Sequence, residues 1–209
     1  IQTFTGNLLD VNTYFLIKDD KCIIVDPGSN GEGIKETVKK NGWQPIGVIL
    51  THAHFDHFLS ANSINAYFRI PLYIHSEGFD ILYDPRKNIS YGAGFIKPLA
   101  LEKDIEVKIL PEGKATIGNF NIDVLHVPGH SPDSICLYVP KDKFIITGDA
   151  LFKLSVGRAD LFQGDMGLLV ANVKNKILML PDDTEVYPGH GPKTTVQSEK
   201  MYNPYVRIH

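Results

Sequence analysis

The chain has 209 residues, of which 43% are hydrophobic and 22% are charged, and its formal net charge at pH 7 is -3. This balance is typical of a globular protein, and the length suits one large domain over residues 1–209. The sequence has no lysine or arginine block and no apolar run near the roughly 20 residues that span a bilayer. We therefore expect neither a nucleic-acid partner nor a membrane partner.

The N-terminal residues and the cysteines indicate a cytoplasmic protein. Ile1-Gln2-Thr3-Phe4 has neither the basic end nor the long apolar core of a signal peptide. Cys22 and Cys136 each lie inside an apolar run, which predicts buried, inert strand residues rather than a disulfide.

Local patterns predict the elements of the first half of the chain. They are two strands within residues 11–25 that turn at Asp19-Asp20, a helix capped by Asn30 that ends near Lys40, a strand at Ile46–Leu50, a helix at Phe58–Phe68 and a short strand at Pro71–Ile74. Residues 83–100 are irregular and contain glycines and aromatic residues, among them Tyr91. Long loops of this kind are often functional, so we interpret this one as a lid or substrate contact, or else as a solvated excursion.

Short strands dominate the second half, and two helices follow them. The predicted strands are Val107–Leu110, Ala115–Ile117, Phe120–Val127, Ile135–Val139, Phe144–Thr147 and Thr184–Tyr187, and the predicted helices are Gly167–Leu180, which Pro181 stops, and Thr194–Met201. His126 lies inside an alternating strand and is interpreted as a core histidine.

A cluster of metal-type residues follows the strand that ends at Leu50. His52 and His54 are two residues apart in an extended segment, so both side chains can reach one ion. Asp56 and His57 come where the chain must turn and can face a second ion. Imidazole and carboxylate suit zinc, iron or manganese. A chance histidine-rich surface loop is the alternative interpretation.

The same arrangement recurs along the chain. Four apolar strands end in a turn with a metal-type residue, at Thr51-His52, Gly129-His130, Gly148-Asp149 and Gly189-His190. Glycine before the ligand permits an unusual backbone angle and a close approach to an ion. The candidate ligands are His52, His54, Asp56, His57, His130, Asp149 and His190. Seven ligands are too many for one tetrahedral ion and suit two ions that share a carboxylate.

Asp26 follows another strand and precedes Pro27-Gly28. It is interpreted either as a turn former or as a carboxylate that orients a ligand histidine.

The ordered ligand set resembles that of the metallo-β-lactamase superfamily. Residues 129–134, 148–152 and 155–161 look like the glyoxalase II branch, the hydroxyacylglutathione hydrolases, in its short single-domain form. The resemblance implies an α/β fold: an αββα sandwich of two mixed β-sheets flanked by helices. It also implies that His52, His54 and His130 bind one metal ion, that Asp56, His57 and His190 bind the other, and that Asp149 bridges them. The family's C-terminal helical domain, which binds glutathione, is expected to be absent.

The expected function is hydrolysis of a small-molecule thioester, such as a hydroxyacylglutathione, by a hydroxide that bridges two divalent metal ions. Zinc is the first choice of metal, with iron or manganese as alternatives. Asp56 is expected to orient the hydroxide, and Arg158 and Tyr91 to contact the substrate.

Three alternatives stay open at this point. A persulfide dioxygenase would use the same frame with a single iron ion. A lactone, β-lactam or other ester hydrolase would keep the chemistry and change the substrate. A non-enzymatic protein would use the metal ions for folding or binding, although structural sites are usually closed with four ligands.

Overall fold

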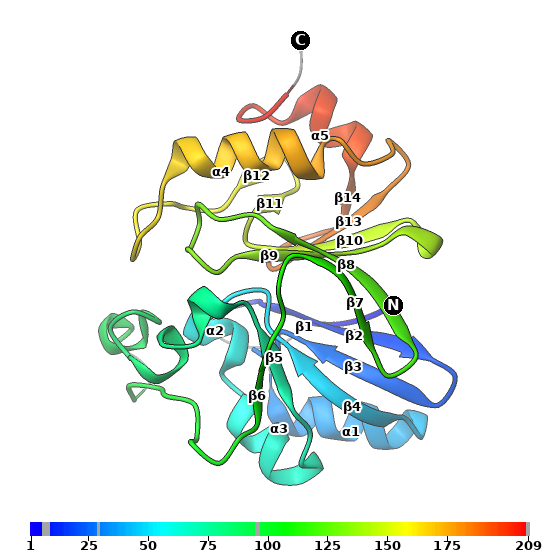
Figure 1. Cartoon of the computed structure of the whole chain (residues 1–209), viewed down its shortest axis with the longest axis vertical. Helices are drawn as coiled ribbons and strands as arrows, with labels where there is room; N and C mark the ends of the chain where they lie inside the picture. The colour runs from blue at the N-terminus through cyan, green and yellow to red at the C-terminus, as the bar shows by residue number, and fades with distance from the viewer. Residues whose placement is uncertain (6–8, 29, 95–96, 208–209) are drawn as a thin grey trace. The chain divides into compact units, whose positions relative to one another are not determined.

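The structure, a computed structural model, describes residues 1–5, 9–28, 30–94 and 97–207. The chain divides into two compact units (Figure 1). Unit 1 comprises Ile1–Leu110 and Gly118–Phe120, and unit 2 comprises Pro111–Ile117 and Asn121–His209. A single domain over residues 1–209 stays a prediction.

Unit 1 contains a mixed six-stranded sheet. Its order is β1-β2-β3-β4-β5-β6. The first three strands pair antiparallel and the last four pair parallel. The strands are β1 (Gln2–Thr5), β2 (Asn12–Lys18), β3 (Lys21–Val25), β4 (Gln44–Ile49), β5 (Leu72–Ile74) and β6 (Val107–Ile109). The predicted turn at Asp19-Asp20 joins β2 to β3, whereas β1 was not predicted.

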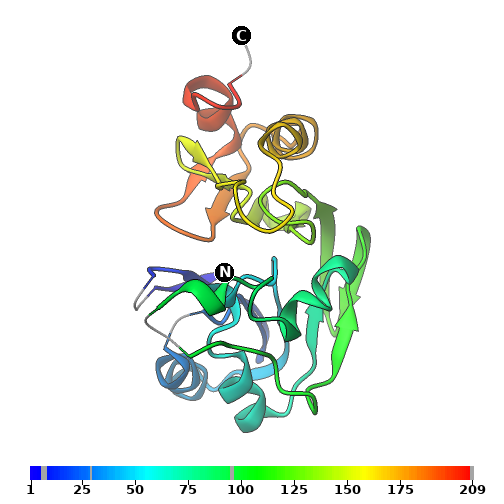
Figure 2. The same cartoon turned by 90° about the vertical axis from the view of Figure 1, so that its left-hand side faces the viewer.

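Two helices of unit 1, α1 (Gly31–Asn41) and α3 (Ala61–Phe68), lie on one side of this sheet (Figures 1 and 2). The Asn30 side chain accepts hydrogen bonds from the first turn of α1, as the sequence predicts, and Gly42 ends the helix at φ 69°. Ile34 and Val38 are the buried residues of α1 and form one apolar stripe.

The predicted helix at Phe58–Phe68 is wrong at its start. A separate short helix, α2 (Phe55–Phe58), precedes α3. The helices are interrupted because the Ser60 backbone N–H donates to the Pro27 carbonyl, 2.9 Å away, instead of continuing the ladder of α2. Propensity patterns cannot show such a tertiary hydrogen bond.

Unit 2 contains a second mixed sheet. Its order is β14-β13-β10-β9-β8-β7, and β11 and β12 form a separate hairpin. β10 pairs parallel with β13 and antiparallel with β9. The strands are β7 (Gly113–Ile117), β8 (Phe120–His126), β9 (Ile135–Val139), β10 (Phe144–Gly148), β11 (Leu151–Phe152), β12 (Ser155–Val156), β13 (Glu185–Pro188) and β14 (Thr194–Thr195).

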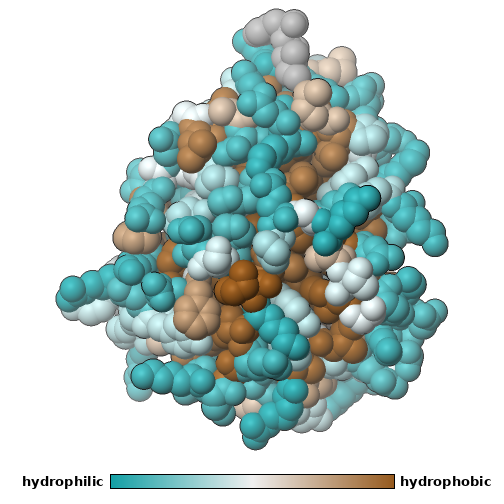
Figure 3. All heavy atoms as spheres, in the orientation of Figure 1, coloured by the Kyte–Doolittle hydropathy of each residue, from teal (hydrophilic) through white to brown (hydrophobic). Residues whose placement is uncertain are grey.

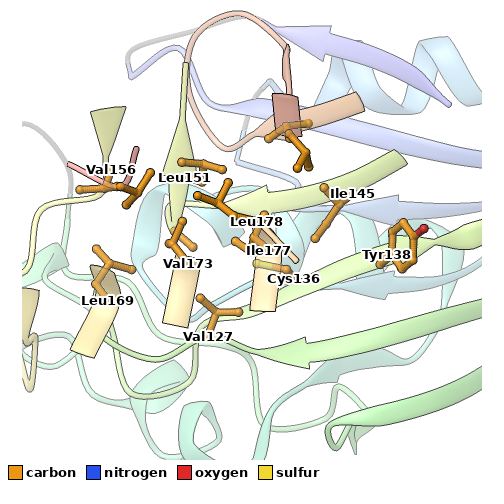
Figure 4. Close-up of a cluster of buried hydrophobic side chains, with 14 residues drawn as sticks. Val127, Cys136, Tyr138, Ile145, Leu151, Val156, Leu169, Val173, Ile177 and Leu178 are labelled. Atoms are coloured by element: carbon orange, nitrogen blue, oxygen red, sulfur yellow. The ribbon is translucent and has the colours of Figure 1, made fainter. Parts of the chain in front are cut away.

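The long helix predicted for unit 2 is regular only in its first half. α4 (Met166–Asn172) continues as one π-helical turn over Val173–Ile177, where the Leu178 N–H donates to the Val173 carbonyl at 2.9 Å. The wider turn allows Val173, Ile177 and Leu178 all to be fully buried in the core of unit 2 (Figure 4). Core packing therefore prevails over the regular helix that the spacing predicted.

The last helix begins at Val196, two residues after the predicted start at Thr194. Thr194 and Thr195 form β14, which pairs with β13, and α5 (Val196–Tyr202) starts after them. The Thr195 hydroxyl caps α5 by accepting from Ser198 N.

Both cysteines are buried and free, as predicted. Burial raises the pKa of Cys22 to about 12 and also raises the pKa of Cys136. Hydrophilic residues predominate on the surface drawn in Figure 3. In the described part of the chain, no helix combines the length and apolarity needed to cross a membrane.

The turn that follows β8 packs directly against α4. Gly129 has φ 138°, and a Cβ there would lie 2.4 Å from the backbone nitrogen of Leu169. The Asp165 N–H donates to the Gly129 carbonyl at 2.7 Å. The turn can therefore approach the helix only with glycine at this position.

Gly129→Ala should lower the free energy of unfolding by about 2–5 kcal/mol, because it combines overpacking with a strained backbone angle. Gly113→Ala is the matched control, since Gly113 has φ 121° but open space around its Cβ position. Urea unfolding of both variants measures the difference. Equal losses of unfolding free energy in the two variants would mean that the close contact with α4 does not add to the cost of the substitution.

Candidate metal centre

In unit 1, the candidate ligands lie within the eight residues after β4. The rings of His52 and His54 lie with centroids 4.7 Å apart, and those of His52 and His57 lie 4.1 Å apart. The Asp56 carboxylate lies 3.9 Å from His57 Nε2. α2 provides the predicted turn, since it brings Asp56 and His57 back toward the extended pair. The structure thus brings together the four unit 1 residues that the sequence singled out.

Asp26 is fully buried and organises this cluster. One carboxylate oxygen accepts from the Thr51 backbone N–H at 2.7 Å. The other accepts from the Thr51 hydroxyl at 2.7 Å and lies 2.9 Å from His57 Nδ1. Because a carboxylate only accepts, His57 Nδ1 carries the hydrogen. The contacts of Asp26 match both interpretations: its carboxylate orients a histidine, and its φ of 50° and the 2.7 Å hydrogen bond from Gly28 N–H to its carbonyl belong to a turn.

Thr51 extends this network to His52, a role that the sequence analysis missed. The Thr51 hydroxyl uses its single hydrogen on Asp26, so it accepts from His52 Nδ1, 3.1 Å away. In both His52 and His57 the neutral ring then carries its lone pair on Nε2. A hydroxyl directly before the first histidine was the available signal, but such residues are common at strand ends.

Gly28 places the Asp26 turn beneath the histidine cluster. A Cβ on Gly28 would lie 1.8 Å from the Asp56 carbonyl oxygen. No larger residue therefore fits between the two segments.

The irregular stretch at 83–100 is tied to the same cluster. The Asn88 carbonyl accepts from the Phe55 N–H at 3.0 Å, one residue after His54. The fully buried Asn88 side chain donates to the Leu99 carbonyl and accepts from the Ser90 N–H. The loop is therefore anchored at Asn88 by defined hydrogen bonds, and a substrate contact by its exposed part stays a prediction.

Tyr91 lies three residues after this tether and is 63% exposed. The Arg86 guanidinium lies 5.5 Å from its ring centroid. An exposed aromatic ring on an anchored loop can contact a ligand at low entropic cost.

In unit 2, the candidate ligands are grouped around Asp149. One of its carboxylate oxygens lies 3.6 Å from His130 Nε2 and 3.6 Å from His190 Nε2. Ligands about 2.0–2.1 Å from a tetrahedral ion lie roughly 3.4 Å apart, so these separations suit shared metal ions. His130 Nδ1 donates to the Arg158 carbonyl at 2.7 Å, which again leaves the lone pair on Nε2.

Gly157 brings the ends of this group together. A Cβ on Gly157 would lie 1.9 Å from the Asp149 carbonyl oxygen and 3.0 Å from His130 Nδ1. The glycines before the candidate ligands differ in backbone angle. Gly129 and Gly148 have the predicted positive φ, whereas Gly189, which the structure also describes, does not.

Arg158, the expected substrate contact, is paired with a neighbouring carboxylate. Its exposed guanidinium makes two 2.7 Å hydrogen bonds to Asp160. These hydrogen bonds hold the pKa of Asp160 at about 2, below its ordinary value of 3.8. Arg158 can therefore bind a substrate anion only by sharing or exchanging this partner.

His126 is half-buried, and its Nε2 lies 2.8 Å from the Pro132 carbonyl. It serves the turn that carries His130 rather than the middle of the core. His209 lies outside the described residues.

The chemistry of both groups fits divalent metal ions. Buried imidazoles with Nδ1 held by an acceptor present Nε2 in the ligating state, and nearby carboxylates supply negative charge. His52, His54, His57 and His130 are buried, which limits competition from water.

The sequence profile of the metallo-β-lactamase superfamily matches residues 6–190. Among curated relatives, the probable metallo-hydrolase YqgX of Bacillus subtilis is 38% identical over 95% of this chain and 93% of its own. The hydroxyacylglutathione hydrolase GloC of Haemophilus influenzae is 30% identical over 91% of each.

Solved structures agree. The BLEG-1 B3 metallo-β-lactamase is 37% identical, with a TM-score of 0.93 over 98% of each chain. TTHA1623 in a di-iron-bound form is 34% identical, with a TM-score of 0.87 over 99% of this chain and 100% of its own. These likenesses confirm the predicted fold class. The chain therefore belongs to the metallo-β-lactamase superfamily.

Proposed function

We propose that this protein is a hydrolase that uses two divalent metal ions to cleave thioesters. His52, His54 and His130 bind one ion, Asp56, His57 and His190 bind the other, and Asp149 binds both. The observation that carries the proposal is the anchoring of His52, His57 and His130 through Nδ1, which presents Nε2 for coordination in each unit.

Bound ions of this kind lower the pKa of a water molecule toward about 7 and polarise a carbonyl group. Asp56 orients the attacking water by accepting one of its hydrogens. The thiolate that leaves a thioester is stable without a proton, so the reaction does not depend on a general acid. Asp26, Thr51 and the Arg158 carbonyl keep the histidines in the required orientation.

Support for a thioester substrate comes from the likeness to GloC, whose name states hydroxyacylglutathione hydrolysis. The likeness to BLEG-1 makes β-lactam hydrolysis the second candidate on the same site. The di-iron form of TTHA1623 supports two ions over one and keeps iron beside zinc and manganese as the metal. Tyr91 and Arg158 are the proposed substrate contacts.

Protein purified without added metal should contain two divalent ions per chain and hydrolyse S-lactoylglutathione faster than nitrocefin. Asp149→Ala should lose at least one ion and the activity, because it removes the shared ligand. Asp183→Ala, which removes an exposed carboxylate in the same unit, is the control. A single iron per chain, with oxygen consumption on glutathione persulfide, would replace the proposal with a persulfide dioxygenase.

Asp26→Asn should weaken metal binding by about 10–100-fold, because an amide cannot accept from all three donors and His57 loses its orientation. Thr13→Val is the matched control, since the Thr13 hydroxyl donates to the Asp26 backbone carbonyl and leaves the carboxylate contacts intact. Isothermal titration with zinc measures both affinities. Unchanged affinity in Asp26→Asn would show that the carboxylate has no orienting role.

Tyr91→Ala should raise KM several-fold with little change in kcat, because the ring is proposed to bind substrate without taking part in the chemistry. Tyr67→Ala is the control. Tyr67 is 50% exposed and its ring also lies near a cation, Lys39, but it belongs to α3 and not to the 83–100 loop. Steady-state kinetics on the preferred thioester decides. A fall in kcat at constant KM, or equal effects of the two variants, would contradict substrate binding by Tyr91.

A further inference from the structure

Glu199 of α5 is a fully buried carboxylate with neutral hydrogen-bond donors. One of its oxygens accepts from the Thr194 hydroxyl at 2.6 Å. The other accepts from the Leu154 backbone N–H at 2.9 Å and from the Asn203 amide at 2.8 Å. A carboxylate is costly to bury, so its position calls for a specific role.

The bonds of Glu199 and Asn203 converge on the tip of the β11–β12 hairpin. Glu199 accepts from the Leu154 N–H. The carbonyl of the next residue, Ser155, accepts from the Asn203 amide at 3.0 Å. The Glu199 side chain of α5 and the Asn203 side chain at its C-cap thus bind backbone groups of consecutive residues. Leu154 has φ 59°, an unfavourable angle for a residue with a side chain, so the tip needs such contacts to keep its conformation.

The hairpin links two groups that touch His130. Asp149 lies just before β11, and its carboxylate is 3.6 Å from His130 Nε2. Arg158 lies just after β12, and its carbonyl is 2.7 Å from His130 Nδ1. The strands pair over only two residues each, so the hairpin has little rigidity of its own. A shift of its tip would move both contacts of His130.

We propose that Glu199 and Asn203 are positioning residues for the metal ligands of unit 2. They hold the β11–β12 hairpin so that Asp149 and the Arg158 carbonyl stay in register with His130. This inference rests on the proposed metal site.

Glutamine at position 199 can preserve the hydrogen bonds without the charge. Its oxygen can accept from Leu154 and Asn203, while its amide donates to the Thr194 hydroxyl, which can reverse its role. Alanine can do neither. The two substitutions therefore separate hydrogen-bonded positioning from an effect of the buried charge.

The test is titration of the metal-free full chain with Co²⁺, followed by visible absorption, in wild type, Glu199→Ala and Glu199→Gln. Glu199→Ala should bind at least one Co²⁺ about 10–100-fold more weakly, as expected when a group that orients metal ligands is lost. Its absorption spectrum should also change. Glu199→Gln should retain the wild-type affinity and spectrum.

Leu178→Ala controls for lost stability, because Leu178 is buried in the same core and its side chain is apolar. It should lower the unfolding midpoint and leave Co²⁺ binding unchanged. If Glu199→Ala does not fold, Asn203→Ala replaces it, with the same expected direction.

Wild-type Co²⁺ affinity and spectrum in Glu199→Ala would overturn the inference. The same result in Asn203→Ala would overturn it if Glu199→Ala does not fold. Equal weakening in Glu199→Ala and Glu199→Gln would also overturn it, in favour of the buried charge. A wild-type chain that binds no Co²⁺ would instead overturn the proposed function, and the inference would fall with it.

Discussion

The buried carboxylate of Asp26 is the constraint on which the histidine cluster of unit 1 depends. β3 and β4 are parallel neighbours, so their ends place Asp26 beside Thr51, and the Asp26 N–H bonds to the Ile49 carbonyl at 3.0 Å. Removing a carboxylate from water is costly unless hydrogen bonds replace the lost hydration. Three donors meet that need, and two of them lead to His57 and, through Thr51, to His52. The satisfaction of one buried charge therefore also sets the orientation of two imidazoles.

Unit 2 reaches the same result by a different device. His130 is oriented by a backbone carbonyl, that of Arg158, rather than by a carboxylate. That carbonyl is held by a short hairpin, and Gly157 is needed because its Cβ position coincides with the Asp149 carbonyl. The glycine at the turn and the bonds from α5 together do for His130 what Asp26 does for His57. In both units the orienting atom belongs to a residue just beyond a strand: the Asp26 carboxylate follows β3, and the Arg158 carbonyl follows β12 after Gly157.

Substrate choice is a separate matter from metal chemistry, since one fold supports many reactions. The proposed ligands and the groups that orient them would serve equally for attack on a thioester carbonyl or on a β-lactam carbonyl. What distinguishes substrates must lie on the surrounding loops. The loop tethered at Asn88 presents Tyr91, and the turn after β12 presents Arg158 already paired with Asp160. In the proposed function, these two segments carry the substrate contacts.

The sequence by itself predicted the candidate ligand residues and the strands that carry them, because hydrophobic periodicity and residue chemistry are local properties. The fold class followed from the resemblance of the ordered motifs to the metallo-β-lactamase superfamily. The sequence also identified Asp26, though only as one of two interpretations. Only the tertiary structure decided that Asp26 contacts His57 and that Glu199 binds the β11–β12 hairpin, because both contacts join residues distant in the chain. The hydrogen bond from His52 to the Thr51 hydroxyl also needed the structure, because it follows from the Thr51 hydrogen bond to Asp26. The break between α2 and α3 and the π-helical turn were likewise decided by a hydrogen bond to Pro27 and by core packing. Long-range contacts of this kind leave no period or spacing in the sequence.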